Sequence, residues 1–153
     1  MTVSSTVRTP VPGSSIREGQ TVRLAIPARA EYISLCRLAL AGVGRTRGLD
    51  DELVADLKLA LTEACTNSIR HAYPQANGIV EVVYDLFPDR LVIEVADSGA
   101  GFARPPGARL EASELSEGGL GMAIIEAIAD ELEIGPGAGG RGATLRLVKR
   151  LPG

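Results

Sequence analysis

Two polar residues one helical turn apart, Glu63 and Asn67, form the most chemically suggestive pair in the sequence. At about 100° per residue they share one face of a helix predicted over 50–72, opposite an apolar face that includes Leu57 and Leu61. A carboxylate in this position can accept a proton from an attacking hydroxyl, and a carboxamide oxygen can ligate Mg²⁺. The alternative is a solvated helix face that makes ordinary i,i+4 contacts.

A second acidic residue, Asp97, ends a predicted strand and is followed by Gly99 and Gly101. Glycines after a strand let the backbone approach a ligand closely. An aspartate at such a strand end can accept a hydrogen bond from an exocyclic amine such as that of adenine. A plain Asp-Ser-Gly turn is the alternative. The Rossmann fingerprint is absent, because Arg104 stands where its third glycine would be.

A second glycine cluster, formed by Gly118, Gly119 and Gly121 around Leu120, is predicted to open a helix. The start of a helix presents free N–H groups and partial positive charge to a phosphate. A loop hinge is the alternative. The sequence contains neither a P-loop nor the motifs of eukaryotic-type protein kinases. Thr144, in the last predicted strand, is a further candidate, or an ordinary β-branched strand residue.

The remaining reactive residues argue against hydrolase and zinc chemistry. One histidine, His71, and two cysteines, Cys36 and Cys65, lack the spacing of a catalytic triad or a zinc site. We expect a structural histidine and buried, reduced thiols. The net charge of −3 lacks the basic surplus of a nucleic-acid binder. A compact polyanion such as ATP can still be held by backbone amides and a metal.

The elements that must position these residues indicate an α+β fold. Apolar periodicity predicts the following order: a strand over 20–27, helices over 30–47 and 50–72, strands over 78–87 and 90–97, a helix over 118–132, a short strand near 133 and a strand over 143–151. Asp50 is the expected N-cap of the second helix. This order is not that of a doubly wound sheet. It predicts a two-layer sandwich, with a mixed, mostly antiparallel sheet and helices on one face.

The length of 153 residues fits one domain over 19–153, preceded by a flexible tail over 1–18 that is rich in Ser, Thr, Pro and Gly. Residues 98–117 have little periodicity and are expected to form a mobile loop or lid. No apolar run is long enough for a membrane span or a signal peptide. The cytoplasm is therefore the expected location.

In order and spacing, four segments resemble the motifs of the GHKL (Bergerat-fold) ATPases. The segment LTEACTNSIRHAY resembles the N box, VADSGAGF the first glycine box, EGGLGMAIIE the second, and GGRGATLRL the terminal Gly-Thr segment. Within that family, residues 28–151 are similar to the anti-sigma-factor serine kinases of the RsbW and SpoIIAB type.

The resemblance implies a role for each matching residue in binding ATP and Mg²⁺. Glu63 corresponds to the general base and Asn67 to the Mg²⁺ ligand, while Asp97 corresponds to the aspartate that reads adenine in a pocket shaped by Gly99 and Gly101. The implied phosphate contacts and the adenine-side threonine are the following: Gly118, Gly119, Leu120, Gly121, Met122 and Thr144.

The resemblance also implies partners. Such a kinase phosphorylates a serine or threonine of a small STAS-type anti-anti-sigma protein, and it holds a sigma factor inactive until that antagonist competes. Arg37 and Thr66 match positions of partner contact, Arg104 and Arg109 fall in the ATP lid, and a homodimer is expected. The alternatives are a non-catalytic nucleotide-binding anti-sigma or adaptor module, and a detached histidine-kinase catalytic domain. For the phosphoacceptor helix of the latter we expect no room in 153 residues.

Overall fold

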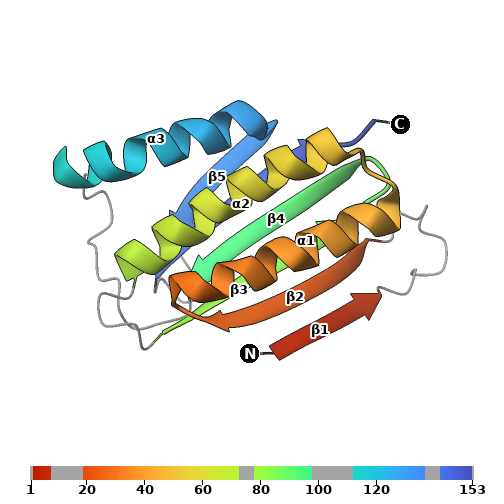
Figure 1. Ribbon diagram of the computed structural model, residues 1–153, viewed down its shortest axis with the longest axis horizontal. Coiled ribbons are helices and arrows are strands. Elements are labelled where there is room, and N and C mark those ends of the chain that lie inside the picture. The colour runs from red at the N-terminus through yellow and green to blue at the C-terminus, as the bar shows by residue number, and fades with distance from the viewer. Residues whose placement is uncertain (1, 8–18, 73–77, 98–111, 137–141, 153) are drawn as a thin grey trace.

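The computed structural model of the protein describes residues 2–7, 19–72, 78–97, 112–136 and 142–152 (Figure 1). Its elements are, in chain order, β1 (Thr2–Val7), β2 (Gln20–Pro27), a 3-10 turn (Ala30–Tyr32), α1 (Ile33–Arg47), α2 (Asp51–Ala72), β3 (Ile79–Leu86), β4 (Arg90–Asp97), α3 (Ala112–Ile128), β5 (Glu131–Pro136) and β6 (Ala143–Arg150). None of the described helices is long and apolar enough to cross a bilayer.

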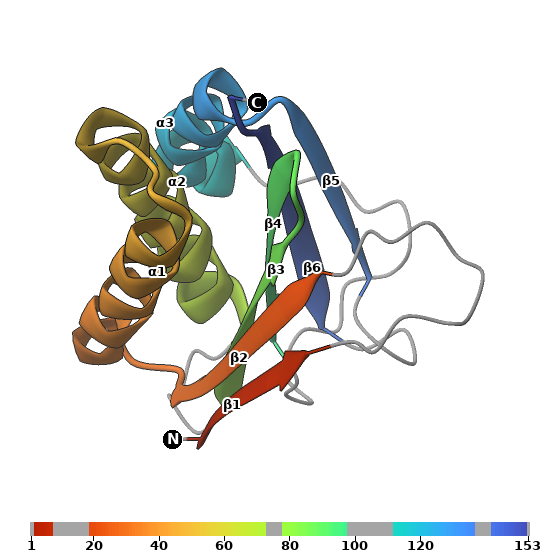
Figure 2. The ribbon, with the colours of Figure 1, turned by 90° about the vertical axis from the view of Figure 1, so that its right-hand side faces the viewer.

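The strands form one six-stranded sheet in the order β1-β2-β3-β4-β6-β5. Every pairing among the described strands is antiparallel. Helices α1, α2 and α3 pack on one face of this sheet (Figure 2). The predicted two-layer α+β sandwich is therefore confirmed.

The first strand was not expected from the sequence. Residues 1–18 were predicted to be a tail, but Thr2–Val7 pair with β2 along their whole length, from Thr2 opposite Ala25 to Val7 opposite Gln20. The prediction is wrong for these residues, because β-branched Thr and Val favour an extended strand despite the polar composition. Residues 8–18 lie outside the described part of the chain.

The helix boundaries follow from local chemistry. Asp50 caps α2 as predicted, since its Oδ1 accepts a hydrogen bond from the backbone N–H of Leu53 at 2.7 Å. Helix α1 ends at Gly48, whose φ of 70° lies in the left-handed region that glycine tolerates best. The short connection between these caps holds α1 and α2 side by side across the sheet (Figure 1).

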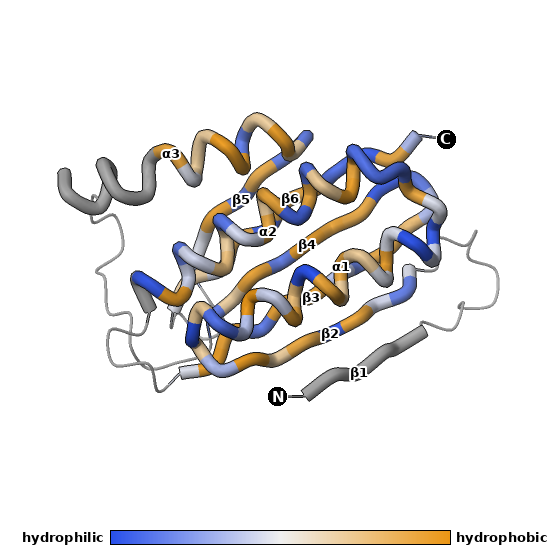
Figure 3. Tube along the Cα trace, in the orientation of Figure 1, coloured by the Kyte–Doolittle hydropathy of each residue, from blue (hydrophilic) through white to orange (hydrophobic). Residues whose placement is uncertain are grey.

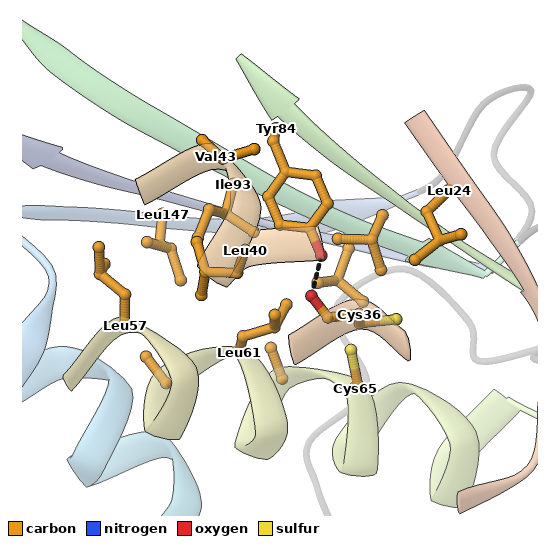
Figure 4. Packing of buried hydrophobic residues seen from close by; sticks show 14 of the residues in the cluster. Leu24, Cys36, Leu40, Val43, Leu57, Leu61, Cys65, Tyr84, Ile93 and Leu147 are labelled. Carbon is orange, nitrogen blue, oxygen red and sulfur yellow. Dashed lines mark hydrogen bonds between the residues drawn. The ribbon is translucent and has the colours of Figure 1, made fainter. Parts of the chain in front are cut away.

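The core lies between the sheet and the helices (Figure 4). The inner strands are largely apolar along their length (Figure 3), and side chains such as Leu61 and Ile93 are fully buried. The hydroxyl of Tyr84 donates to the backbone oxygen of Cys36 at 2.6 Å, which satisfies a buried polar group. Cys36 and Cys65 are both buried and free, as predicted.

Helix α3 begins earlier than the sequence predicted. We expected a loop over 98–117 and a helix start at Gly118, but the helix begins at Ala112. Alanine, leucine and glutamate in the segment before Gly118 favour helix strongly enough to outweigh the cost of about 1 kcal/mol for each glycine further along. Residues 98–111 of the expected lid lie outside the described residues.

Candidate functional site

The predicted site residues of α2 and β4 lie at one end of the molecule. Both elements run toward the same end, and β6 starts there (Figures 1 and 2). Asp97, the last residue of β4, is only 3 % exposed. In the alternation of the strand it shares a face with Ile93 and Val95, which belong to the core beneath the helices. The Asp97 carboxylate is thus directed into the layer between sheet and helices.

The two oxygens of the Asp97 carboxylate have different surroundings. Oδ2 accepts a hydrogen bond from the backbone N–H of Ala143 at 3.0 Å. Oδ1 is buried and has no hydrogen-bond partner. Burial raises the pKa of Asp97, and the bond from Ala143 offsets this rise only in part. A buried oxygen without a hydrogen-bond partner can accept a hydrogen bond from a ligand that carries an N–H donor, such as the exocyclic amine of adenine.

Gly142 allows the start of β6 to pack closely against this oxygen. Its φ is +67°, and a Cβ at this position would collide with Asp97 Oδ1 and lie 2.6 Å from the Asp97 backbone oxygen. Gly142 belongs to the glycine-rich segment GGRGATLRL, but neither Gly142 nor Ala143 was predicted as a site residue. The signal was available, since a glycine directly before a strand often marks a close approach of two backbones.

Glu63 faces helix α3 from α2. A Cβ built on Gly121 would lie 2.6 Å from Glu63 Oε2, so the carboxylate rests against the backbone of α3. One turn further along α2, the amide nitrogen of Asn67 donates to the thioether sulfur of Met122 at 3.5 Å. This contact directs the Asn67 carboxamide oxygen away from Met122. The structure therefore brings together Glu63, Asn67, Gly121 and Met122.

A single carboxamide oxygen is a sparse set of ligands for a metal. Among the described residues, no group of three or more His, Cys, Asp or Glu side chains could hold a metal ion. Mg²⁺ tolerates this situation, because it keeps several waters and takes phosphate oxygens as ligands. Asn67 fits Mg²⁺ that arrives with a nucleotide better than a resident ion.

The second glycine cluster is not at a helix start. Gly118 and Gly119 lie inside α3, where backbone N–H groups bond to carbonyls four residues earlier. Leu120 is 73 % exposed. In this conformation the amides of the cluster are not open to phosphate. Four of the residues named from the sequence lie outside the described residues: Gly99, Gly101, Arg104 and Arg109.

Thr144 is not brought to Asp97. It pairs with Ala96 in the ladder between β4 and β6, and directly paired residues share a face of the sheet. Because Ala96 and Asp97 alternate, the Thr144 side chain lies on the face away from the helices. The residue beside Asp97 is Ala143.

The predicted partner residue Arg37 lines a groove on the outer surface of α1 and α2. This helical groove has a volume of about 630 Å³ and is formed by Arg37, Asp51, Val54, Ala55, Lys58, Leu59 and Thr62. Leu59 is 46 % exposed, which is unusual for a large apolar side chain on a helix. Thr66 lies further along α2, is half-buried, and does not line the groove. His71 is in the last turn of α2, and its side chain lies outside the described part.

The fold is that of a known class of ATPase domain. The chain belongs to the histidine kinase-like ATPase domain family, whose model matches residues 26–149. The GHKL resemblance of the sequence is thereby confirmed.

Several named proteins are similar to this chain in sequence or in structure. Serine-protein kinase RsbW of Bacillus cereus is 36 % identical, and the match covers 75 % of this chain and 77 % of the relative. The RsbW proteins of Bacillus mycoides and Bacillus thuringiensis subsp. konkukian match at the same identity and coverage. Among solved structures, the histidine kinase domain of a blue-light activated histidine kinase from Erythrobacter litoralis is similar, with a TM-score of 0.50 and 21 % identity over 80 % of this chain and 60 % of that one. This last likeness concerns the fold.

Proposed function

We propose that the chain is an ATP- and Mg²⁺-dependent serine/threonine-protein kinase that also acts as an anti-sigma factor. In this role it binds a sigma factor and phosphorylates a STAS-type anti-anti-sigma protein. The observation that carries the proposal is the buried Asp97 carboxylate, whose Oδ1 has no partner and lies next to Gly142. The similarity to proteins named serine-protein kinase RsbW supports the choice of protein substrate.

Adenine recognition begins at Asp97. Leaving a buried acceptor without a partner costs about 1–3 kcal/mol, and a ligand N–H at Oδ1 would remove this cost. Because Gly142 has no Cβ, it packs directly against the carboxylate without displacing it. The same residues would disfavour a guanine placed in that position, because guanine presents a carbonyl oxygen where adenine presents an amine.

Glu63 is the proposed general base. Its carboxylate would accept the proton of the substrate hydroxyl as that oxygen attacks the terminal phosphate in line. Bound at Asn67, Mg²⁺ would balance the charge that develops on the phosphate oxygens. Glu63 Oε2 rests against α3 at Gly121, so this helix fixes the position of the carboxylate.

The glycine cluster has to change conformation if it binds phosphate. Its amides become available only when α3 begins near Gly118 rather than at Ala112. Gly118 and Gly119 lie just after the segment that would unwind, and each weakens the helix by about 1 kcal/mol, which makes the helix easier to interrupt there. Hydrogen exchange should therefore speed up over residues 112–118 when ATP and Mg²⁺ are added. Unchanged exchange there would remove these amides from the phosphate site.

The helical groove is the proposed surface for the protein partners. Arg37 and Lys58 give it positive charge, Asp51 is its one acidic residue, and Leu59 adds exposed apolar area. Such a surface fits an amphipathic segment with an acidic flank. A homodimer is a further part of the proposal, and light scattering on the purified protein tests it.

Transfer of labelled phosphate is the test of the kinase. The wild-type chain is incubated with γ-labelled ATP, Mg²⁺ and STAS proteins encoded near its gene, beside Glu63→Gln and Thr144→Ala. Label should appear on a serine or threonine with the wild type and with Thr144→Ala. Glu63→Gln should bind ATP normally yet transfer about 10²–10⁴ times more slowly, the usual contribution of a general base. ATP binding without transfer by the wild type to any of these proteins would favour the non-catalytic adaptor instead.

A further inference from the structure

Two buried side-chain oxygens have no hydrogen-bond partner among the described residues, and they are Asp97 Oδ1 and Ser68 Oγ. The proposed hydrogen bond from the adenine amine accounts for Asp97 Oδ1. Ser68 was not identified from the sequence, and the steps proposed so far do not use it. A buried hydroxyl without a partner is destabilising, so its presence needs a reason.

Ser68 lies on the side of α2 that faces the sheet. It follows Ala64 by four residues and Leu61 by seven, and both of these are buried in the core. Helix α2 packs on β4, and the two elements end on the same side of the molecule (Figures 1 and 2). Ser68 lies four residues before the end of α2 and Asp97 is the last residue of β4, so both are near the ends of these two packed elements.

The hydroxyl of Ser68 is not used within its own helix. Helical hydroxyls commonly donate to the carbonyl four residues back. Thr62, also on α2, does so with the backbone oxygen of Lys58 at 2.8 Å, and Thr46 on α1 does so with that of Gly42 at 2.9 Å. Ser68 makes no such bond. Its hydroxyl is therefore left to interact with something that enters the layer.

We propose that Ser68 reads the base of the bound nucleotide, with its hydroxyl donating to the ring nitrogen N1 of adenine, directly or through one water. The inference rests on the proposed ATP site. Adenine carries a donor amine and the acceptor N1 side by side, and the carboxylate oxygen of Asp97 and the hydroxyl of Ser68 offer the matching acceptor and donor. Ser68 is thus a second specificity residue beside Asp97.

The test compares ATP with 1-deaza-ATP, in which a C–H group replaces N1. Calorimetric titrations with Mg²⁺ are made on the full chain as wild type, as Ser68→Ala and as the control Thr46→Ala, which removes a helical hydroxyl on the surface of α1. Ser68→Ala should weaken ATP binding about five- to tenfold, the effect of one net hydrogen bond. It should bind 1-deaza-ATP within about twofold of the wild type, since that ligand offers the hydroxyl no acceptor. Thr46→Ala should bind both nucleotides as the wild type does.

Equal affinity of wild type and Ser68→Ala for ATP would overturn the assignment. An equal loss for ATP and 1-deaza-ATP would also overturn it, because the serine would then act through the shape of the pocket. Without nucleotide, Ser68→Ala should melt at the wild-type temperature or above it, since an unpaired buried hydroxyl is removed. A lower melting temperature would show that the hydroxyl has a partner within the fold, and would count against the proposal. A wild type that binds neither nucleotide would refute the ATP site itself, whereas the preceding results would refute only the role of Ser68.

Discussion

At the scale of single residues, the most informative feature is a carboxylate that the fold buries and only half satisfies. Asp97 has one hydrogen bond from Ala143 and one oxygen without a partner. A structural role would have been served better by an asparagine or an apolar residue, because burial disfavours the charged form. The free-energy cost of burying this carboxylate is explained if Asp97 binds a ligand.

Asp97→Asn should therefore make the nucleotide-free protein more stable at neutral pH. The pKa of Asp97 is raised by burial above its ordinary value of 3.8, so the folded state holds this proton more tightly than the unfolded state does. Its stabilising contribution is present below that ordinary value and is lost as the pH rises through the raised pKa. Removing the charge should raise stability at pH 7 by about 1 kcal/mol, or a melting temperature higher by about 2–4 °C.

Thermal unfolding from pH 3 to pH 7 checks this expectation. The difference in melting temperature between Asp97→Asn and the wild type should grow with pH over this range. Asp130→Asn is the control, because the carboxylate of Asp130 accepts from the backbone of Arg150 and contacts Lys149, and its charge should help. A variant Asp97→Asn that is less stable at pH 7 than at pH 3, relative to the wild type, would show that the carboxylate is satisfied in the fold.

At the scale of the elements, two glycines permit close contact with the two candidate carboxylates where the elements meet. Gly142 lies where β6 approaches Asp97, and Gly121 lies where α3 approaches Glu63. Each can be compared with a glycine of the same kind of element around which a Cβ meets nothing within 4 Å, Gly135 for the strand and Gly42 for the helix.

Gly142→Ala should abolish ATP binding. Its Cβ would occupy the space beside Asp97 Oδ1, and the positive φ adds a backbone cost of about 1 kcal/mol. Gly135→Ala should bind ATP as the wild type does. Calorimetry on both variants, with circular dichroism to confirm folding, makes the comparison. Normal ATP affinity in a folded Gly142→Ala would place the adenine elsewhere.

Gly121→Ala should separate catalysis from stability. The new Cβ would displace the carboxylate of Glu63, which sits at the end of a flexible side chain and can move. Phosphate transfer should fall by at least about tenfold, because small displacements of a catalytic group are costly. Both Gly121→Ala and Gly42→Ala should keep or raise the melting temperature, since alanine favours helix. Full transfer activity in Gly121→Ala would argue that the observed position of Glu63 is irrelevant to catalysis.

The sequence predicted the elements with strong periodicity and missed those set by context. The alternation at Leu91, Ile93 and Val95 identified β4, and the apolar stripe of α2 placed Glu63 and Asn67 on one face. Strand β1 was missed because an edge strand needs little apolar content, and its polar composition is shared with tails. The start of α3 was wrong because glycine was given more weight as a helix breaker than the segment before it allowed.

Some features of the candidate site could not be predicted either, because they depend on contacts that form only in the folded chain. Gly142 owes its importance to a carboxylate that is 45 residues away in sequence and adjacent only in the folded sheet. Ser68 is an ordinary helix residue by pattern, and only burial without a partner distinguishes it. The resemblance implied an adenine-side role for Thr144, but its pairing with Ala96 places its side chain on the other face of the sheet from Asp97, because side-chain direction reverses with each residue along a strand.

At the scale of the whole molecule, the two proposed activities occupy different surfaces. Nucleotide would bind at the end where α2 and β4 finish, whereas the helical groove lies along the outside of α1 and α2. Helix α2 contributes to both, with Lys58 and Leu59 in the groove and Glu63 and Asn67 one to two turns closer to its C-terminal end. A rigid helix shared by two sites is a direct physical route by which nucleotide and partner could influence each other.

Arg37→Glu should weaken binding of both protein partners and leave ATP binding unchanged. The substitution reverses a charge in the helical groove, and mismatched charges at an interface cost about 2 kcal/mol or more, which is at least about thirtyfold in affinity. Arg45→Glu, on the same helix but outside the groove lining, is the control. Binding of the sigma factor and the STAS protein is measured by surface plasmon resonance. Unaltered affinity of Arg37→Glu for both partners would move the interface away from this groove.

The most direct measurement of the central claim is a calorimetric titration of the folded wild type with ATP and with GTP, both in excess Mg²⁺. We expect one ATP per chain, little or no binding of GTP, and loss of this preference in Asp97→Asn. Absence of any heat with ATP in a protein shown to be folded, or an Asp97→Asn variant that still prefers ATP over GTP as strongly as the wild type, would contradict the account.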